Sequence, residues 1–187
     1  MVYVDDHIEQ LDLAAGLQMI SSQRREQALQ FKHEQGQRQC VAAYLLLKRA
    51  LQVEKDIDIN PQFEYGEHGK PRIVGYPDLH FSLSHCKEAV ACVLSHKPVG
   101  IDVESVGRYR ESVARYAMSD EEMQRIQCSD RPEVEFTRLW TMKESLLKLT
   151  GEGINDQMKQ VLIGVPASAF TIVERLDKNY IYTVCEL

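Results

Sequence analysis

The run Val99-Gly100-Ile101-Asp102-Val103-Glu104 alternates strictly between apolar residues and small or acidic ones. Successive side chains of a β-strand point to opposite faces, so this run predicts a strand with one apolar face and one face that carries Gly100, Asp102 and Glu104. The strand rise places the Cα atoms of the two acids roughly 6.6 Å apart. Two such carboxylates repel each other unless a cation joins them, and Gly100 leaves room beside them for a ligand.

A second stretch, residues 133–150, has the periodicity of a helix. Its apolar residues recur at helical spacing and predict one buried stripe, made of Phe136, Leu139, Met142, Leu146 and Leu149. The opposite face carries Thr137, Thr141, Glu144 and Lys148. On a solvated face, the Glu144–Lys148 pair is worth about 0.3–0.5 kcal/mol. If this face packs beside residues 99–104, Glu144 would instead supply a third acid, and Lys148 would supply a positive charge for a phosphate. Lys143 falls within the apolar arc, where its stem could snorkel to the edge or serve a site.

The remaining elements predict an α+β fold. Helices are expected at 21–52, with a break near Gly36, and at 109–116, 119–128 and 133–150. Strands are expected at 63–65, 79–84, 89–95 and 98–104, around 161–163, and at 180–184, with a turn at 66–71. Ser119 followed by three acids is typical of a helix start. Helices therefore alternate with antiparallel hairpins.

Composition excludes several classes of protein. A chain of 187 residues suits one domain or two small lobes that share a core. No run of about 18 apolar residues is present, and residues 1–6 lack the pattern of a signal peptide, so we expect a cytoplasmic protein without a membrane span. Five cysteines, with no Cys-x-x-Cys pair, argue for reduced thiols and against a zinc site.

The charge distribution bears on possible partners. There are 22 basic and 28 acidic side chains, and the net charge of −6 disfavours a general nucleic-acid binder. Residues 21–49 are locally basic. That stretch could meet an anionic ligand or an acidic partner, or it could form an ordinary solvated helix surface.

Four segments together resemble the 4′-phosphopantetheinyl transferases of the surfactin-synthetase-activating type. They occur in that family's order and span most of residues 63–153: Gly69-Lys70-Pro71, Phe81-Ser82-Leu83-Ser84-His85, the run at 99–104, and residues 140–148. The resemblance implies that the 4′-phosphopantetheine arm of coenzyme A is transferred to a serine of an apo acyl or peptidyl carrier protein. Mg²⁺ is the implied cofactor and 3′,5′-adenosine bisphosphate the implied leaving product. The family fold implies two similar α+β lobes with pseudo-two-fold symmetry, at 1–98 and 99–187, with a coenzyme A cleft between them in a monomer.

The resemblance also implies roles for individual residues. It assigns the metal to Asp102, Glu104 and Glu144. It assigns coenzyme A to Arg38, Lys70, Pro71, Ser84, His85 and Lys148, with Arg24 as a candidate for the 3′-phosphate. Glu144 would accept the proton of the carrier serine, and Lys148 would stabilise the phosphate charge or protonate the leaving group. Outside the family context, Gly69-Lys70-Pro71 is an ordinary turn and His85 an ordinary strand-end histidine.

Two other functions are compatible with the acids alone. A Mg²⁺-dependent phosphodiesterase also gathers carboxylates, but the acidic net charge and the missing second cluster of acids and histidines disfavour it. A catalytically inactive coenzyme A-binding module would have no reason to keep three acids and Lys148 together. For carrier docking, the preferred candidate is the stretch 108–126 with Arg108, Arg110, Arg115 and Arg125, and the N-terminal helix is the other.

Overall fold

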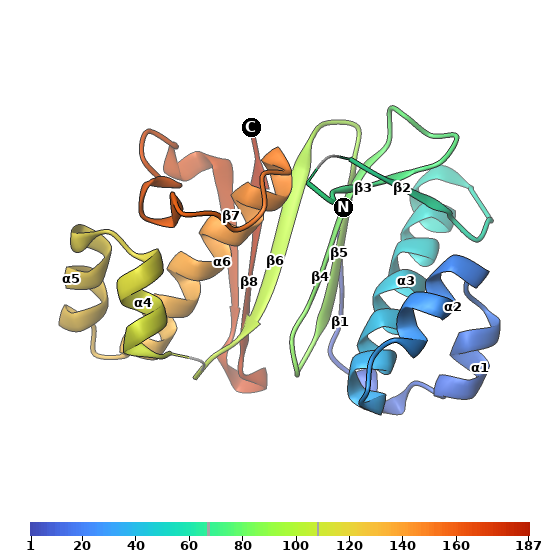
Figure 1. Ribbon diagram of the computed structural model, residues 1–187, viewed down its shortest axis with the longest axis horizontal. Coiled ribbons are helices and arrows are strands. Elements are labelled where there is room, and N and C mark those ends of the chain that lie inside the picture. Colours follow the sequence, from blue (N-terminus) through green and yellow to red (C-terminus); the bar gives the residue numbers. More distant parts are fainter. Residues whose placement is uncertain (67, 108) are drawn as a thin grey trace.

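Two three-stranded antiparallel sheets form the centre of the protein (Figure 1). The first has the strand order β1-β5-β4, with β1 at Val2–Asp5, β4 at His80–His85 and β5 at Val90–Ser95. The second has the order β6-β8-β7, with β6 at Val99–Ser105, β7 at Phe170–Arg175 and β8 at Tyr180–Glu186. A separate ribbon pairs β2 (Phe63–Tyr65) with β3 (Pro71–Ile73). The computed structural model describes residues 1–66, 68–107 and 109–187, so Arg108 of the expected docking stretch and Glu67 of the expected turn lie outside the described residues.

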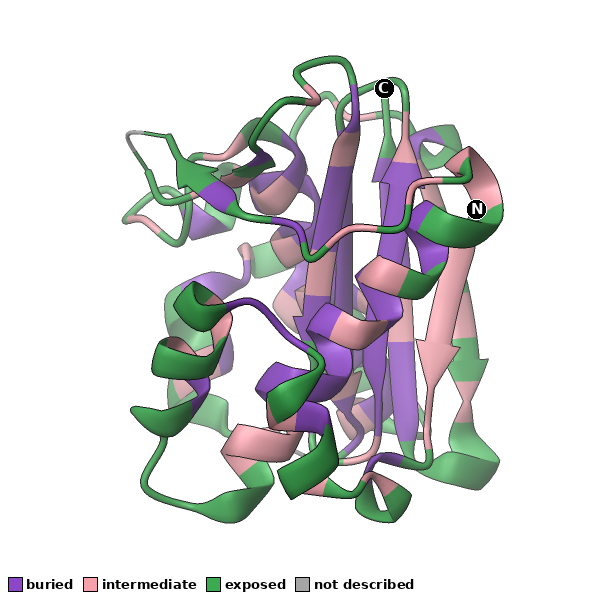
Figure 2. Ribbon diagram, turned by 90° about the vertical axis from the view of Figure 1, so that its right-hand side faces the viewer, coloured by how far each residue is buried: buried purple, intermediate pink, exposed green. Residues whose placement is uncertain are grey.

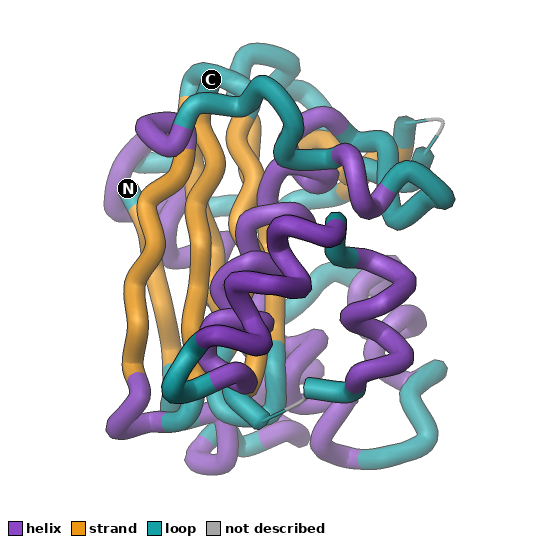
Figure 3. The backbone as a smooth tube through the Cα atoms, turned by 90° about the vertical axis from the view of Figure 1, so that its left-hand side faces the viewer, coloured by secondary structure: helices purple, strands orange, loops and turns teal. Residues whose placement is uncertain are grey.

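Helices cover the outer face of each sheet. One side carries α1 (Leu13–Gln18), α2 (Ser22–Leu29) and α3 (Glu34–Lys55), and the other carries α4 (Glu111–Ala117), α5 (Asp120–Cys128) and α6 (Pro132–Thr150). Short 3₁₀ turns complete the chain: η1 (Ile8–Gln10), η2 (Met158–Gln160), η3 (Ala167–Ala169) and η4 (Leu176–Lys178). The order of layers is therefore helix, sheet, sheet, helix, and Figure 3 shows the second set of helices in front of the strands. This arrangement confirms the α+β class.

Strand alternation explains how the layers pack. In β5, Val90, Cys92 and Leu94 belong to the core under α3, whereas Ala91 and Val93 belong to the core between the sheets. The apolar residues of β6, Val99, Ile101 and Val103, are fully buried in the same inter-sheet core. The central strands are accordingly buried along most of their length (Figure 2). The alternation predicted for residues 99–104 is confirmed, and it turns Gly100, Asp102 and Glu104 toward α6.

The two halves of the chain share one order of elements. In the first half, a strand is followed by the long helix α3 and then by the hairpin β4–β5. In the second half, β6 is followed by α6 and then by the hairpin β7–β8. In each sheet, the strand that comes last in the sequence, β5 or β8, lies in the middle.

The sheets also meet along the edges of β4 and β6, where serine hydroxyls bridge the strands. The backbone N–H of Ile101 donates to Ser82 Oγ at 3.1 Å, and that of Val103 donates to Ser84 Oγ at 3.2 Å. Buried N–H groups need acceptors, and at this edge the serine side chains provide them. This contact places Ser84 directly beside Asp102.

The role expected for Gly100 is wrong. A Cβ atom at this position would lie 1.9 Å from the carbonyl oxygen of Ser145 and 2.6 Å from the backbone nitrogen of Leu149. The space beside the acids is therefore filled by the backbone of α6, not by a ligand. Gly100 instead allows the helix to approach the strand closely enough to bring Glu144 and Lys148 over it.

The polar face of α6 is buried and not exposed to solvent. Thr137 and Thr141 are buried, and Thr141 Oγ1 lies 2.7 Å from Thr183 Oγ1 on β8. Because the helix is covered on both sides, the Glu144–Lys148 pair lies between α6 and the sheet and not on an open surface.

Most predicted elements are present, but several differ, and neither α1 nor β3 was expected. The strand expected around 161–163 is wrong: those residues form turns after η2, and the strand before β8 is β7. The break in the first long helix falls at residues 30–33, before Gly36. The edge strand β1 was not expected, because four residues carry too little periodicity to identify. Within the described ranges, no helix combines the length and apolar character that crossing a membrane requires.

Candidate active site

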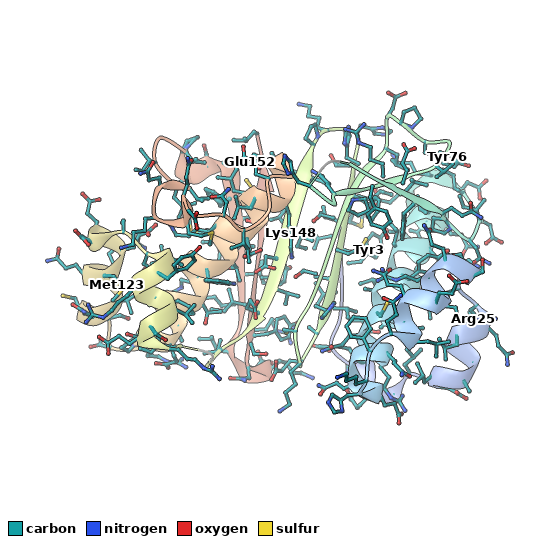
Figure 4. The ribbon with its side chains drawn as sticks, in the orientation of Figure 1. Tyr3, Arg25, Tyr76, Met123, Lys148 and Glu152 are labelled. Atoms are coloured by element: carbon teal, nitrogen blue, oxygen red, sulfur yellow. The ribbon has the colours of Figure 1, made fainter. Side chains whose placement is uncertain are left out.

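Asp102 is the most buried acid of the candidate site, with 3% of its surface exposed. Its Oδ1 atom accepts from Lys148 Nζ at 2.6 Å and from Ser84 Oγ at 2.8 Å. Lys148 Nζ also donates to Ser84 Oγ at 2.8 Å. The three side chains come from β6, β4 and α6, and Figure 4 shows Lys148 near the centre, where the two halves meet. Tertiary packing therefore gathers three of the predicted site residues in one hydrogen-bonded cluster.

Glu144 lies one helical turn before Lys148 and next to the same aspartate. Burial, followed by the charges of Asp102 and Glu104, raises the pKa of Glu144 to about 7, and Lys148 offsets only part of this. Glu104 is half-buried at the end of β6. The three predicted metal residues therefore share one electrostatic environment, in which a carboxyl group can take up or release a proton near neutral pH.

The site offers oxygen atoms of the kind that Mg²⁺ prefers. Asp102 Oδ2 and Glu144 Oε1 are buried oxygens that have no hydrogen-bond partner. Buried unpaired oxygens are costly, and a hard cation that prefers oxygen ligands would satisfy both. In the part of the chain that the structure describes, no three His, Cys, Asp or Glu side chains are already grouped tightly enough to hold a metal ion. The residues fit Mg²⁺ as a pair of open carboxylates with Glu104 beside them.

A cavity of about 220 Å³ opens beside this cluster. Its lining includes Lys70 and Pro71 on one side and Glu144 and Lys148 on the other. Lys70 Nζ donates to the carbonyl oxygen of Leu149 at 2.6 Å, at the C-terminal end of α6. Burial, with a smaller contribution from Arg72, lowers the pKa of Lys70. Lys70 therefore joins the two halves of the protein and lines the cavity as well.

His85 lies at the other end of β4, in a second cavity of about 440 Å³. The basic residues Lys32, His33 and Lys87 line the same cavity. His33 immediately precedes α3 and makes no side-chain cap there, and Gln35 and Gly36 of the helix start also line this cavity. Lys32 and Lys87 were not singled out from the sequence. The basic excess of residues 21–49 pointed toward Lys32, whereas nothing in the sequence marked Lys87.

The two arginines expected to bind coenzyme A are bonded within the first half of the protein. Arg38 Nη2 pairs with Glu34 at 2.5 Å, and Arg38 also donates to the carbonyl oxygen of Leu11. Arg24 donates twice to the carbonyl oxygen of Cys40, at 3.0 and 3.2 Å, and so joins α2 to α3. Neither residue lines the two cavities just described.

Lys143 neither snorkels nor enters the site. Its side chain is fully buried, pairs with Glu122 at 3.0 Å and donates to the carbonyl oxygen of Met158 at 2.7 Å. Glu122 also completes a capping box with Ser119 at the start of α5. The buried pair therefore joins α5 and η2 to α6.

A third cavity, of about 440 Å³, lies on the other side of Glu104. It is lined by Tyr109, Phe136 and Trp140 together with Arg110. Three buried or half-buried acids, a lysine and basic residues in the cavities around them form an arrangement suited to the transfer of a phosphorylated group.

Comparison with known proteins agrees with this chemistry. A model of the 4′-phosphopantetheinyl transferase superfamily matches residues 98–185. The 4′-phosphopantetheinyl transferase Sfp of Bacillus subtilis strain 168 is 28% identical over 200 aligned residues, which cover 98% of this chain and 89% of that protein. The 4′-phosphopantetheinyl transferase gsp of Aneurinibacillus migulanus is 32% identical, over 79% of this chain and 56% of that protein. The 4′-phosphopantetheinyl transferase AcpT of Salmonella typhimurium is 36% identical, over 59% of this chain and 57% of that protein. The chain is therefore similar to 4′-phosphopantetheinyl transferases along most of its length.

The raised pKa of Glu144 leads to a prediction on stability without divalent cations. Because its pKa is higher in the folded chain, at about 7, than in the unfolded chain, stability should fall as the pH rises from about 4.5 through 7. Glu144→Gln removes that charge. At pH 8 in EDTA, the free energy of unfolding of this variant should therefore exceed that of the wild type by more than about 1 kcal/mol. The difference should shrink toward pH 5 in urea titrations. The exposed Glu64→Gln is the control, and a constant offset for Glu144→Gln at both pH values would contradict the assignment.

Proposed function

We propose that this protein transfers the 4′-phosphopantetheine arm of coenzyme A to a serine of an apo acyl or peptidyl carrier protein and releases 3′,5′-adenosine bisphosphate. The carrying observation is the cluster of Asp102, Lys148 and Glu144 at the junction of the two sheets. It lies at one wall of the cavity that Lys70 and Pro71 line. The superfamily match and the named relatives support the same reaction.

The proposed enzyme consists of two lobes, 1–98 and 99–187, with coenzyme A bound between them. The repeated order of strand, long helix and hairpin supports a pseudo-two-fold relation of the lobes. The proposed cleft runs along β4, because Ser84 contacts the acid cluster while His85 lies in the basic cavity. In this arrangement Lys32, His33 and Lys87 lie on the side suited to the phosphorylated adenosine, and Lys70 and Lys148 on the side suited to the pyrophosphate.

Mg²⁺ would be held by Asp102 and Glu144, with Glu104 beside them. When bound, it would polarise the phosphorus under attack and stabilise the negative charge on the leaving group. Glu144, whose pKa is raised to about 7 when no metal ion is bound, would take the proton of the carrier serine. Lys148, 30% exposed and next to the cavity, would stabilise charge on the phosphate.

The direct test is a mass measurement. The protein is mixed with coenzyme A, Mg²⁺ and an apo carrier protein, and the carrier is examined by intact mass spectrometry. Transfer adds one phosphopantetheine arm to the carrier and requires all three components. Consumption of coenzyme A without the carrier would indicate a hydrolase, and binding without either change would indicate an inactive binding module.

The basic cavity gives a prediction for coenzyme A affinity. His85→Ala should weaken coenzyme A binding at least about fivefold, because a hydrogen bond to a charged phosphate is worth about 1.5–3 kcal/mol. Lys70→Ala should weaken it similarly and should also lower the melting temperature, because the bond to the Leu149 carbonyl is lost. Calorimetric titration measures the affinities, with the exposed His96→Ala as the matched control. If both variants bind coenzyme A as tightly as the wild type, His85 and Lys70 do not contact coenzyme A.

The docking surface for the carrier is proposed around α4. Arg115 and Arg125 are paired with Glu111 and Glu135, at 2.5 and 2.6 Å, whereas Arg110 lines the aromatic cavity next to Glu104. An acidic carrier that presents its serine to the site would therefore meet Arg110 first among the described arginines of this stretch. Paired arginines offer a partner less net charge.

Charge reversal tests this surface. Arg110→Glu should raise the KM for the carrier at least about fivefold and reduce its salt dependence, with little change for coenzyme A, and Arg115→Glu should have a smaller effect of the same kind. Arg25→Glu is the control, because Arg25 lies on α2 at the far end of the molecule from Lys148 (Figure 4). An increase in carrier KM for Arg25→Glu alone would move the docking surface to the N-terminal helices.

We also propose that the enzyme works as a monomer in the cytoplasm. The pairing of two lobes within one chain supports the first part, since both walls of the proposed cleft then come from the same molecule. The five cysteines are free, and four of them are buried, which suits a reducing compartment.

A further inference from the structure

We propose that Lys148 is a latch: in the ligand-free protein its ammonium group stays on Asp102 and repels a divalent cation from the open oxygens beside it, and a phosphate ligand must draw it away before the cation can bind well. The inference rests on the proposed function, in which coenzyme A supplies the phosphate. It predicts that the cation and coenzyme A bind cooperatively, and that this cooperativity depends on one side chain.

The first support is the saturation of one oxygen of Asp102. Asp102 Oδ1 receives both Lys148 Nζ and Ser84 Oγ, at 2.6 and 2.8 Å. The Ser84 hydroxyl is itself fully used, because it donates to Asp102 and accepts from Lys148 and from the Val103 N–H. Asp102 is held in this arrangement on one side, while its Oδ2 stays unpaired. The aspartate is therefore oriented in advance, with one oxygen open and the other bound to the lysine.

The second support is the charge balance. A buried carboxylate without a cationic partner is strongly disfavoured, so Lys148 has to stay on Asp102 while no other cation is bound. A divalent cation at the open oxygens of Asp102 and Glu144 would then lie close to the ammonium group and be repelled by it. An anionic phosphate in the adjoining cavity removes this conflict, because it offers Lys148 an alternative partner of opposite charge.

The third support is that Lys148 can reach both positions. Its side chain is 30% exposed, in contrast to the 4% exposed side chain of Asp102, and it lines the 220 Å³ cavity together with Lys70. A long, flexible stem can exchange one partner for another without a change in the backbone. Lys70 differs in this respect, because it is bonded to the carbonyl oxygen of Leu149 and not to an acid.

The latch is tested by metal binding with no carrier present. Mn²⁺ serves as the probe, and its free concentration is followed by electron paramagnetic resonance. Without coenzyme A, Lys148→Met should bind Mn²⁺ at least tenfold more tightly than the wild type. Lys70→Met is the matched control, since it removes one positive charge from the same cavity without releasing Asp102, and it should change the affinity no more than about threefold. Equal gains in the two variants would mean a general charge effect and would overturn the latch.

Cooperativity is the second measurement. In the wild type, coenzyme A should tighten Mn²⁺ binding, and by linkage Mn²⁺ should tighten coenzyme A binding by the same factor. This factor should be at least fivefold smaller in Lys148→Met, and equal factors would overturn the proposal. If Lys148→Met does not fold, Lys148→Gln, which keeps a hydrogen-bond donor for Asp102, carries the same expectations. A wild type that shows the latch but modifies no carrier would reject the proposed function alone, and transfer without cooperative binding would reject the latch alone.

Discussion

Asp102→Asn should reduce kcat/KM for carrier modification at least about a hundredfold, which corresponds to about 2.7 kcal/mol of transition-state stabilisation. The substitution keeps the size of the side chain and removes its charge. Asparagine is a poor ligand for Mg²⁺, and the amide no longer holds Lys148 in place. The fold should persist, because Lys148 is partly exposed and can turn to solvent. Rates are measured by intact mass of the carrier, and folding by thermal melting.

The matched control is Asp58→Asn, since Asp58 is an exposed aspartate far along the chain from the cluster. It should leave kcat/KM within about twofold of the wild type, as surface changes usually do. If Asp102→Asn keeps more than about a tenth of the wild-type kcat/KM, a loss below about 1.4 kcal/mol, the proposed site is wrong.

Gly100→Ala should destabilise the protein by at least about 2 kcal/mol, which lowers the melting temperature by about 4–8 °C in a chain of this size. The added methyl group would lie 1.9 Å from the carbonyl oxygen of Ser145, and backbone cannot move aside as a side chain can. α6 must therefore shift away from β6. That shift would carry Glu144 and Lys148 away from Asp102, so kcat/KM should also fall, by about a hundredfold for a displacement near 1 Å.

Gly66→Ala separates this clash from the general effect of removing a glycine. A Cβ atom at Gly66 meets only the Lys70 carbonyl oxygen, at the ordinary distance of 3.8 Å. This control should change the melting temperature little. A Gly100→Ala protein as stable and as active as the wild type would mean that α6 does not pack on β6 as closely as the structure shows.

Much of the local structure was predictable because it depends on neighbours in the chain. Ser119 and the acids after it predicted the start of α5, where the capping box is present. The hairpin β4–β5 and the helix α6 fall close to their expected bounds. The strand before β8 was misplaced, because Val161-Leu162-Ile163 is as apolar as a strand. In the structure Val161 and Leu162 pack against two small cores from a turn, and Ile163 is exposed.

By itself, the sequence determined the alternation of residues 99–104, the periodicity of α6 and the four segments that indicate the family. Those features are local, so the order of residues carries them directly. Only the tertiary structure decided what covers the second face of β6. The close approach of α6 explains why a glycine stands at position 100. The hydroxyl of Thr183 explains how the polar Thr141 can be buried. The pairing of Lys148 with Asp102 joins residues 46 positions apart, and so it depends on the approach of a helix to a strand, which no local pattern encodes.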